Sequence, residues 1–293
     1  MLYLLTASFI WSFSFGLIKG NLTSLHPNLV SFIRIGISFL VFLPFIKINS
    51  IPNRLKMRLM VIGAIQYGLM YIAYIYSYKF LKGYEVALFT IFTPLYISII
   101  YDITKKRYHR RYLIISLLAV AGTAIIVYKE IGSSSFLPGF ILIQLSNLFF
   151  AWGQIKYREI MKKNVDIGDK DIFAYLYAGA FLVTLSALLL TVDLNTISIT
   201  TEQILTLIYL GIVASGVAFF LWNFGVRRSG IGTISVMNNL KIPLAVFVSV
   251  TVFGESGNLP RILIGCAVLI SALVYNEISE NKTGSVSSRT SGK

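Results

Sequence analysis

A lysine lies near the middle of a long apolar stretch. Lys241 follows Asn238 and Asn239 and precedes Pro243 in the segment NNLKIPLAVFVSV. A cation at mid-membrane depth costs about 2.5–3.5 kcal/mol on insertion scales. Pro243 removes one backbone donor and loosens the helix near the carbonyl of Asn239, which makes it a candidate hinge. We expect Lys241, with both amides, to contact a solute in a wet cavity, and a polar clamp between helices is the alternative.

Arg34 is a second cation inside an apolar stretch. It lies about 9 Å along the stretch 28–48, counted by helical rise. From there its side chain can extend to the outer membrane interface, as long basic side chains do. The other interpretations are a contact with a carboxylate of the solute and a lock that closes the outer gate.

Four tyrosines share one face of the stretch 57–78. Tyr67, Tyr71, Tyr74 and Tyr78 are separated by steps of four, three and four, which is the spacing of one helix face. They extend through the whole stretch, so an interfacial aromatic belt explains only its ends. The first three are candidate solute contacts, and packing against a neighbouring helix is the equal alternative.

Other polar and aromatic residues within the apolar stretches are weaker candidates for the same cavity. They are Trp11, Ser14, Thr90, Tyr96, Asn147, Trp152, Trp222 and Asn223. Each of these residue types is individually more often a packing residue. Pro94, within the stretch 84–104, is the second candidate hinge.

The acidic residues avoid the membrane interior. All 12 Asp and Glu lie at or near the ends of apolar stretches or in loops, and Glu85 is the least exposed of them. Proton-coupled carriers commonly keep a carboxylate at mid-depth, so exchange or facilitated diffusion is favoured. His26 and His109 are isolated, and the sequence has neither a metal-spaced His/Cys cluster nor a Gly-rich phosphate loop. We expect no cofactor, no metal and no enzymatic activity.

The elements that carry these residues are membrane helices. Of the 293 residues 56% are hydrophobic and 13% charged, and the mean hydropathy is +0.76. Ten apolar blocks each approach the ~20 residues that cross a hydrocarbon core. The blocks are 2–20, 28–48, 57–78, 84–104, 111–128, 136–157, 171–191, 203–226, 230–252 and 259–277. The sequence therefore predicts an all-α polytopic membrane protein with ten transmembrane helices.

The net charge of +14 is distributed by side of the membrane. With ten helices and a cytoplasmic N-terminus, most Lys and Arg fall in cytoplasmic segments, as the positive-inside bias requires. We therefore expect both termini in the cytoplasm and contact of the basic segments with anionic membrane lipid. The same distribution argues against a nucleic-acid partner.

Three short segments recur in the same order along the chain. The pairs are GLIKG at 16–20 with GQIKY at 153–157, TPL at 93–95 with IPL at 242–244, and VYKEI at 127–131 with VYNEI at 274–278. They define two halves, 1–131 and 136–278, of five helices each. Because five is odd, equivalent helices run in opposite directions, which is an inverted repeat with a solute site at its midplane. The polar tail, 279–293, is expected to be disordered.

The chain resembles an EamA-type transporter of the drug/metabolite transporter superfamily. The resemblance rests on FIWSFSFGLIK in the first block, HPNLVSFIR entering the second and IPLAVFVSVTVFGE at the ninth. The spacing from Pro243 to Glu255 also fits the family's half-ending pattern, whereas Lys106 stands twelve residues after Pro94 in the first half. The resemblance implies transport of amino acids or related metabolites.

These observations predict a secondary transporter of a small metabolite in the cytoplasmic (inner) membrane of a bacterium. It would act by alternating access between the halves. An interior with Lys, Asn and Tyr and no acid suits a solute with a carboxylate. Amino acids rank first, and a nucleoside-bearing amino acid such as S-adenosylmethionine ranks second. The alternative of another class is a non-transporting membrane scaffold.

The charge distribution predicts a topology. The basic loops 47–58 and 104–111 should face the cytoplasm, and the segment 192–202 should face outward. A cysteine introduced at Thr196 should therefore react with an impermeant thiol reagent in intact cells, and one at Ser50 should react only after permeabilisation. The opposite pattern would reverse the orientation.

Overall fold

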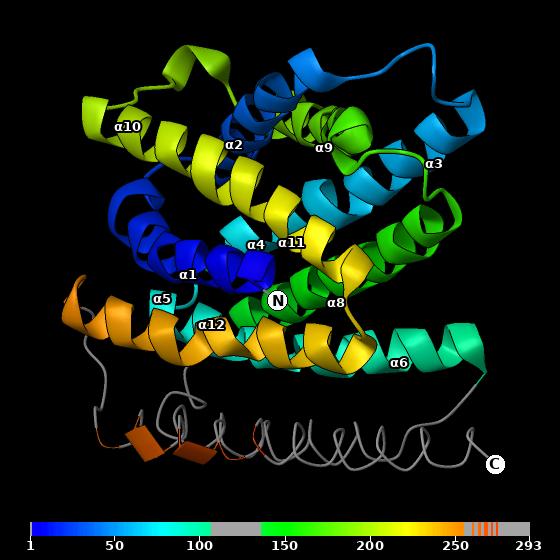
Figure 1. Cartoon of the computed structure of the whole chain (residues 1–293). Helices are drawn as coiled ribbons and strands as arrows, with labels where there is room; N and C mark the ends of the chain where they lie inside the picture. Colours follow the sequence, from blue (N-terminus) through cyan, green and yellow to red (C-terminus); the bar gives the residue numbers. More distant parts are fainter. Residues whose placement is uncertain are drawn as a thin grey trace.

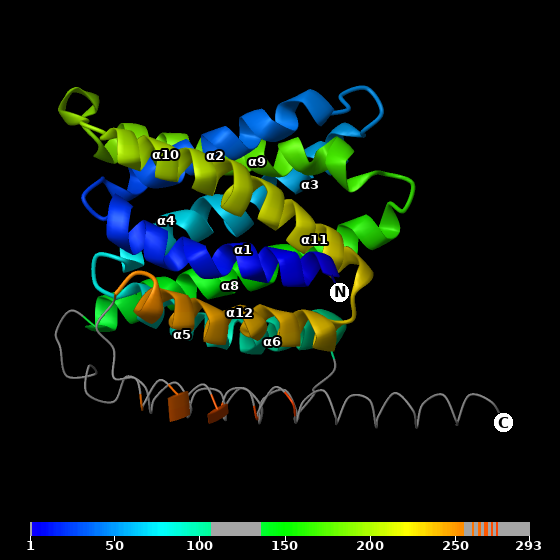
Figure 2. The same cartoon turned by 60° about the vertical axis from the view of Figure 1, so that its left-hand side comes forward.

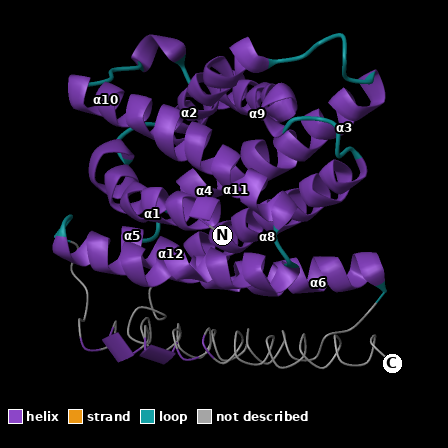
Figure 3. Cartoon of the chain, in the orientation of Figure 1, coloured by secondary structure: helices purple, strands orange, loops and turns teal. Residues whose placement is uncertain are grey.

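The computed structural model describes residues 2–106 and 136–254 and seven single positions between 260 and 274. Within the described residues every regular element is a helix, and none is a strand (Figure 3). This agrees with the apolar composition, because a membrane interior offers no water to backbone N–H and C=O groups, and a helix pairs them internally.

Several helices are interrupted by short segments with a different helical turn. The first half contains α1 Leu2–Leu17, η1 Ile18–Leu22, α2 Pro27–Phe42, η2 Leu43–Phe45, α3 Asn53–Gly63, η3 Ala64–Leu69, α4 Met70–Ser77, α5 Gly83–Phe89, η4 Thr90–Phe92 and α6 Thr93–Lys105. The second half contains α8 Phe136–Lys163, α9 Asp169–Thr191, η5 Leu194–Thr196, α10 Thr201–Tyr209, η6 Leu210–Val217, α11 Ala218–Arg228 and α12 Ile231–Thr251. The segments η1, η3 and η6 are π-helical (wide turns), and η2, η4 and η5 are 3₁₀-helical (tight turns).

Within the described residues, seven helical stretches are long and apolar enough to cross a membrane. They are Leu2–Leu22, Pro27–Phe45, Asn53–Ser77, Gly83–Lys105, Phe136–Lys163, Asp169–Thr191 and Thr201–Arg228. The helix α12 contributes a further 21 residues. The chain is therefore an integral membrane protein.

The ninth expected block corresponds to α12. The helices that correspond to the first four blocks and to the sixth, seventh and eighth begin and end within a few residues of the expected bounds. The largest difference is at the sixth block, expected at 136–157, because α8 continues to Lys163. The block 111–128, most of the block 259–277, Glu255 and the tail 279–293 lie outside the described residues. The count of ten helices therefore stays a prediction.

The helices that the structure describes form three layers (Figures 1 and 2). The helices α2, α3, α9 and α10 make one outer layer, α1, α4, α8 and α11 the middle layer, and α5, α6 and α12 the next. The most extensive contacts join the expected halves, since α1 packs on α12, α2 and α3 pack on α9, and α4 packs on α8. The middle layer is thus enclosed on both sides by helices of the two halves.

The two proline positions differ. Pro94 stands at the start of α6, directly after the tight turn η4 that divides the expected block 84–104. Here its missing N–H leaves no helical acceptor unpaired. Pro243, by contrast, lies inside α12, which runs without a break from Ile231 to Thr251. The helix shows no break at Pro243, and its role as a hinge stays a prediction.

Two glycines permit a close crossing between the expected halves. A Cβ atom on Gly63 of α3 would lie 1.8 Å from the carbonyl oxygen of Leu176, and one on Gly179 of α9 would lie 1.9 Å from that of Met60. Neither backbone carbonyl can move without displacing its helix. Small residues let membrane helices approach in this way, so this reciprocal contact fixes α3 against α9.

Gly179→Ala should destabilise the protein although alanine is the better helix former. The added methyl group must separate α3 from α9, and overpacking of this kind costs about 1–3 kcal/mol. The measurement is the melting temperature of the purified protein. Gly20→Ala is the matched control, because a Cβ atom at Gly20 meets nothing within 4 Å. Equal melting temperatures for the two variants would contradict the close crossing.

Candidate functional site

A cavity lies between the helices of the middle layer and their neighbours. The space in it that the centre of a water molecule can reach is about 70 Å³. This is below the ~300–1,000 Å³ of small-molecule sites, so a bound solute requires side chains of the wall to move. Its wall is formed by Trp11, Ser14, Phe15, Arg34, Met70, Tyr71, Tyr74, Thr90, Thr93, Ser146, Asn147, Phe150, Phe219 and Lys241.

Lys241 enters the cavity wall from the middle of α12. It is 6% exposed, and its Nζ atom lies 5.0 Å from the ring centre of Trp11 and 5.7 Å from that of Phe150. Within the described part of the chain it has neither a hydrogen bond nor an ion pair. Aromatic faces attract a cation but do not replace hydrogen bonds or a counter-charge. The ammonium group is therefore held at the cavity by weak partners only.

Arg34 reaches the same cavity from α2. It is 2% exposed, so it does not extend to the membrane interface. Its Nε atom donates to Ser215 Oγ at 3.1 Å, and its Nη2 atom donates to the Tyr71 hydroxyl at 2.9 Å. Its Nη1 atom is buried without a hydrogen-bond partner among the described residues. Two neutral oxygens thus orient a guanidinium group that keeps one donor unused.

None of the described residues that form the cavity wall is acidic. Glu85, predicted from the sequence to be the least exposed acid, is 4% exposed at the start of α5, whereas Asp169 is 3% exposed, so that prediction is wrong. The Glu85 carboxylate accepts a hydrogen bond from the backbone N–H of Lys82 at 2.7 Å, which is a helix-capping contact. Arg34 and Lys241 therefore share a low-dielectric space without a carboxylate in its wall, and such a space attracts an anion.

The tyrosine face divides into two groups. Tyr71 and Tyr74 line the cavity. Tyr67 does not, because its hydroxyl accepts a hydrogen bond from Asn223 Nδ2 at 2.8 Å and its ring stacks on Tyr177. It lies in the wide turn η3, which changes the angular spacing of residues along the helix. The hydroxyls of Tyr74 and Tyr78 bond each other at 2.7 Å.

A hydrogen-bonded wall faces the cavity from α8 and the divided helix α5–η4–α6. Asn147 Nδ2 donates to the carbonyl oxygen of Phe89 at 2.8 Å, and Thr93 Oγ1 donates to Asn147 Oδ1 at 3.2 Å. The free carbonyl groups of a tight turn need such partners. Thr90 completes this wall and donates to the carbonyl of Ala87 at 2.7 Å. Asn147 therefore both stabilises the turn η4 and presents its amide to the cavity.

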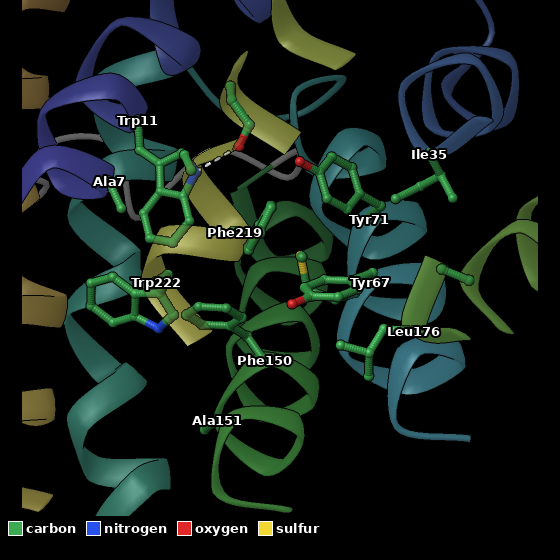
Figure 4. Close-up of a cluster of buried hydrophobic side chains, with 14 of the residues drawn as sticks. Ala7, Trp11, Ile35, Tyr67, Tyr71, Phe150, Ala151, Leu176, Phe219 and Trp222 are labelled. Carbon is green, nitrogen blue, oxygen red and sulfur yellow. Dashed lines mark hydrogen bonds between the residues drawn. The ribbon is translucent and has the colours of Figure 1, made fainter. Parts of the chain in front are cut away.

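Four aromatic side chains pack against one another, and we call them the aromatic partition: Trp11, Phe150, Phe219 and Trp222 (Figure 4). The first three line the cavity. The indole rings of Trp11 and Trp222 are 5.1 Å apart between centres. Trp11 donates from Nε1 to the carbonyl of Ala214 at 2.9 Å, which fixes it on η6. Trp222 is fully buried behind it.

Seven of the residues expected at the cavity lie outside its wall: Asn238, Asn239, Tyr67, Tyr96, Trp152, Trp222 and Asn223. Asn238 is buried beyond the aromatic partition and donates to the carbonyl of Ile234 at 2.9 Å. Tyr96 contacts Gln144 Oε1 at 3.3 Å. Trp152 lines a separate groove on the outside of α3 and α8, together with Arg54, Arg58 and Lys156.

Six other cavity residues were not expected from the sequence: Phe15, Met70, Thr93, Ser146, Phe150 and Phe219. Helical spacing contained a signal for three of them. Phe15 follows Trp11 by four residues, and Phe150 and Ser146 share a helix face with Asn147. Nothing in the composition separates the remaining three from ordinary packing residues.

A many-helix membrane protein with a cavity between its helices, lined by two cations, has an arrangement found in solute transporters. The chain belongs to the EamA-like transporter family, whose model matches residues 1–128 and 137–276, and hence to the drug/metabolite transporter superfamily. The family and the relatives described next are transporters, which places the chain with carriers rather than enzymes.

Three curated relatives carry related names. The chain is 36% identical to the biotin transporter of Salmonella typhimurium (strain LT2) over 278 residues, covering 93% of this chain and 91% of the relative. The same identity and coverage hold for the biotin transporter of Escherichia coli (strain K12). The probable biotin transporter of Pseudomonas aeruginosa (strain PAO1) is 33% identical, covering 96% and 99%.

A solved crystal structure shares the fold. It superposes with a TM-score of 0.73 and covers 96% of this chain and 97% of that chain. Its sequence identity is 17%, so the likeness shows the fold alone.

Tyr71→Phe should lower the melting temperature. It removes the hydroxyl that Arg34 donates to at 2.9 Å and that contacts Ser215 Oγ at 2.8 Å. Leaving a buried donor of a charged group unpaired costs about 1–3 kcal/mol or more. Tyr76→Phe is the matched control on the same helix, because no hydrogen bond of the Tyr76 hydroxyl occurs in the described structure. Equal stability of the two variants would show that Tyr71 does not hold Arg34.

Proposed function

We propose that this protein carries biotin, or a close analogue with the same carboxylate, across the membrane. The single observation that carries the proposal is the pair of cations, Arg34 and Lys241, in one cavity whose wall, among the residues that the structure describes, contains no acid. Biotin joins a neutral ring system to a carboxylate through a short alkyl chain. Its carboxylate can accept from Arg34 Nη1 and from the ammonium of Lys241, and its ring suits the aromatic side chains around them.

The relatives support biotin rather than the solutes expected from the sequence. Three of them are named as biotin or probable biotin transporters, and none of these names gives support to an amino acid or to S-adenosylmethionine. The charges give a physical reason. An amino acid carries an ammonium group, and S-adenosylmethionine adds a sulfonium group, into a cavity that already holds two cations. Like charges at close range disfavour both solutes.

The transport cycle proposed here is alternating access between two inverted halves, 1–131 and 136–278. The two segments that match the family, 1–128 and 137–276, support this division. The contacts of α1 with α12 and of α2 with α9 support a cavity between these two halves. We further propose a bacterial cytoplasmic membrane with both termini inside, as the basic loops indicate.

Lys241→Met should reduce biotin binding and leave the fold intact. A charge-assisted hydrogen bond contributes about 1.5–3 kcal/mol, so the affinity should fall by roughly tenfold to a hundredfold. The melting temperature should not fall, because the change removes a membrane penalty of about 2.5–3.5 kcal/mol. Both quantities are measured on the same purified protein, and uptake of labelled biotin is measured in proteoliposomes.

Lys156→Met is the matched control for this prediction. Lys156 also lies on a membrane helix and is partly buried, but it pairs with Glu159 at 3.0 Å outside the cavity. The control should retain biotin affinity. A Lys241→Met protein that melts at a lower temperature and binds biotin normally would assign Lys241 to the scaffold. Absence of biotin flux with the wild-type protein would contradict the function itself and favour a non-transporting scaffold.

The cavity wall also supports exchange or facilitated diffusion over proton symport. Because none of its described residues is a carboxylic acid, this part of the wall offers no carboxyl group for a transported proton. Collapse of the proton gradient with an uncoupler should therefore leave the initial rate of biotin uptake nearly unchanged, with the internal solute held constant. A several-fold loss of the initial rate would show coupling to protons.

A further inference from the structure

A layer of buried amides lies directly behind the aromatic partition. Gln66 comes from η3, Gln154 from α8, Asn223 from α11 and Asn238 from α12, and all four are 0% exposed. Hydrogen bonds connect them in two groups, since Gln66 Nε2 donates to Asn223 Oδ1 at 3.1 Å, and Asn238 Nδ2 lies 3.5 Å from Gln154 Oε1. The groups adjoin, because a Cβ atom on Gly153 would touch the side chain of Gln66.

Three atoms of this amide layer have no hydrogen-bond partner among the described residues. They are Gln66 Oε1, Gln154 Nε2 and Asn238 Oδ1. Buried side-chain amides are normally paired, so several unpaired atoms in one layer require an explanation. Hydrophobic side chains of similar size would fill the same space without this cost, and packing alone therefore does not account for the amides.

The partners of two of these amides fix their orientation. Trp222 Nε1 can only donate, and it donates to Gln154 at 3.1 Å, so the oxygen of Gln154 must face Trp222 and its NH₂ group must point elsewhere. The carbonyl of Ile234 can only accept, and it accepts from Asn238 at 2.9 Å, so the oxygen of Asn238 is the free atom. The layer thus offers one fixed donor and one fixed acceptor, and Gln66 offers a second acceptor.

We propose that this amide layer is the subsite for the cyclic urea of the solute. A cyclic urea has one carbonyl acceptor and two N–H donors, which requires one donor and two acceptors from the protein. Gln154 Nε2 would donate to the urea oxygen, and Gln66 Oε1 and Asn238 Oδ1 would accept from its two N–H groups. This inference rests on the proposed transport of biotin, whose ring contains such a urea.

The position of the layer fits a solute that is anchored at its other end. Asn238 precedes Lys241 by three residues, so the two lie on one face of α12 about 4.5 Å apart along the axis. A carboxylate held by Lys241 and Arg34 therefore leaves the ring end beside the aromatic partition. In this conformation Trp11 lines the cavity, and Trp222 packs against Trp11 and donates to Gln154. These two rings therefore lie between the cavity and the amide layer. Entry of the ring requires these two side chains to move, as one step of the transport cycle.

The test compares two competing solutes on the purified full-length protein with labelled biotin bound. Unlabelled biotin carries both the carboxylate and the urea, whereas lipoate carries a carboxylate and a sulfur-containing ring without a urea. The wild-type protein should prefer biotin. Asn238→Leu should reduce this preference about fivefold by removing one hydrogen bond to the ring. Lys241→Met should weaken both solutes and leave the preference unchanged.

Asn28→Leu is the matched control. Asn28 is also buried with an unpaired Oδ1 atom, but it lies on α2 outside the cavity wall and donates to Thr191 Oγ1 at 2.7 Å. It should leave the preference for biotin unchanged. Gln66→Met tests the same subsite from a second helix, and it decides the question should Asn238→Leu fail to fold.

Two results would overturn the proposal. An unchanged preference for biotin in Asn238→Leu and Gln66→Met would remove the urea subsite and leave biotin transport intact. A wild-type protein that binds neither solute would remove both proposals together. A loss of preference confined to these two variants supports the subsite, because a purely structural role would weaken both solutes equally.

Discussion

Two cations enclosed in one membrane cavity without an acidic partner impose the strongest constraint on this protein. Arg34 is oriented by the hydroxyls of Tyr71 and Ser215, and Lys241 lies against the rings of Trp11 and Phe150. Neutral partners of this kind offset only part of the free energy that it costs to remove a charged group from water. An anion that enters the cavity offsets this cost, and its departure restores it. The same two charges would therefore attract the solute into the cavity and still allow its release.

The surrounding helices keep the two cations in position from opposite halves of the chain. Arg34 is carried by α2, which is packed on α9, and Lys241 is carried by α12, which is packed on α1. The glycine crossing of α3 with α9 fixes a further part of the same interface. A relative movement of α2 and α12 would change the spacing of Arg34 and Lys241. In the proposed alternating-access cycle, solute affinity and conformation would be coupled through that spacing.

Sequence reasoning predicted the membrane helices and both cations, because a charge within an apolar stretch is visible without a structure. It could not decide where Arg34 points, since snorkelling and burial follow from the same position along a helix. A regular helix predicts Tyr67 on the same face as Tyr71 and Tyr74. The wide turn η3 changes the angular spacing of the residues, so Tyr67 does not line the cavity. Gln66 and Gln154 gave no signal, because their role depends on contacts with Trp222 and Asn223 from another part of the chain.

The proposed recognition of the solute by Arg34 and Lys241 depends most directly on the charge of the solute. The decisive measurement is the affinity of the purified wild-type protein for biotin and for biotinamide, in which a neutral amide replaces the carboxylate. The two solutes share the ring, so their difference isolates the contribution of Arg34 and Lys241. The account predicts that biotinamide binds at least about tenfold more weakly, as expected for the loss of charge-assisted hydrogen bonds. Equal affinities would contradict the recognition of an anion by this cavity.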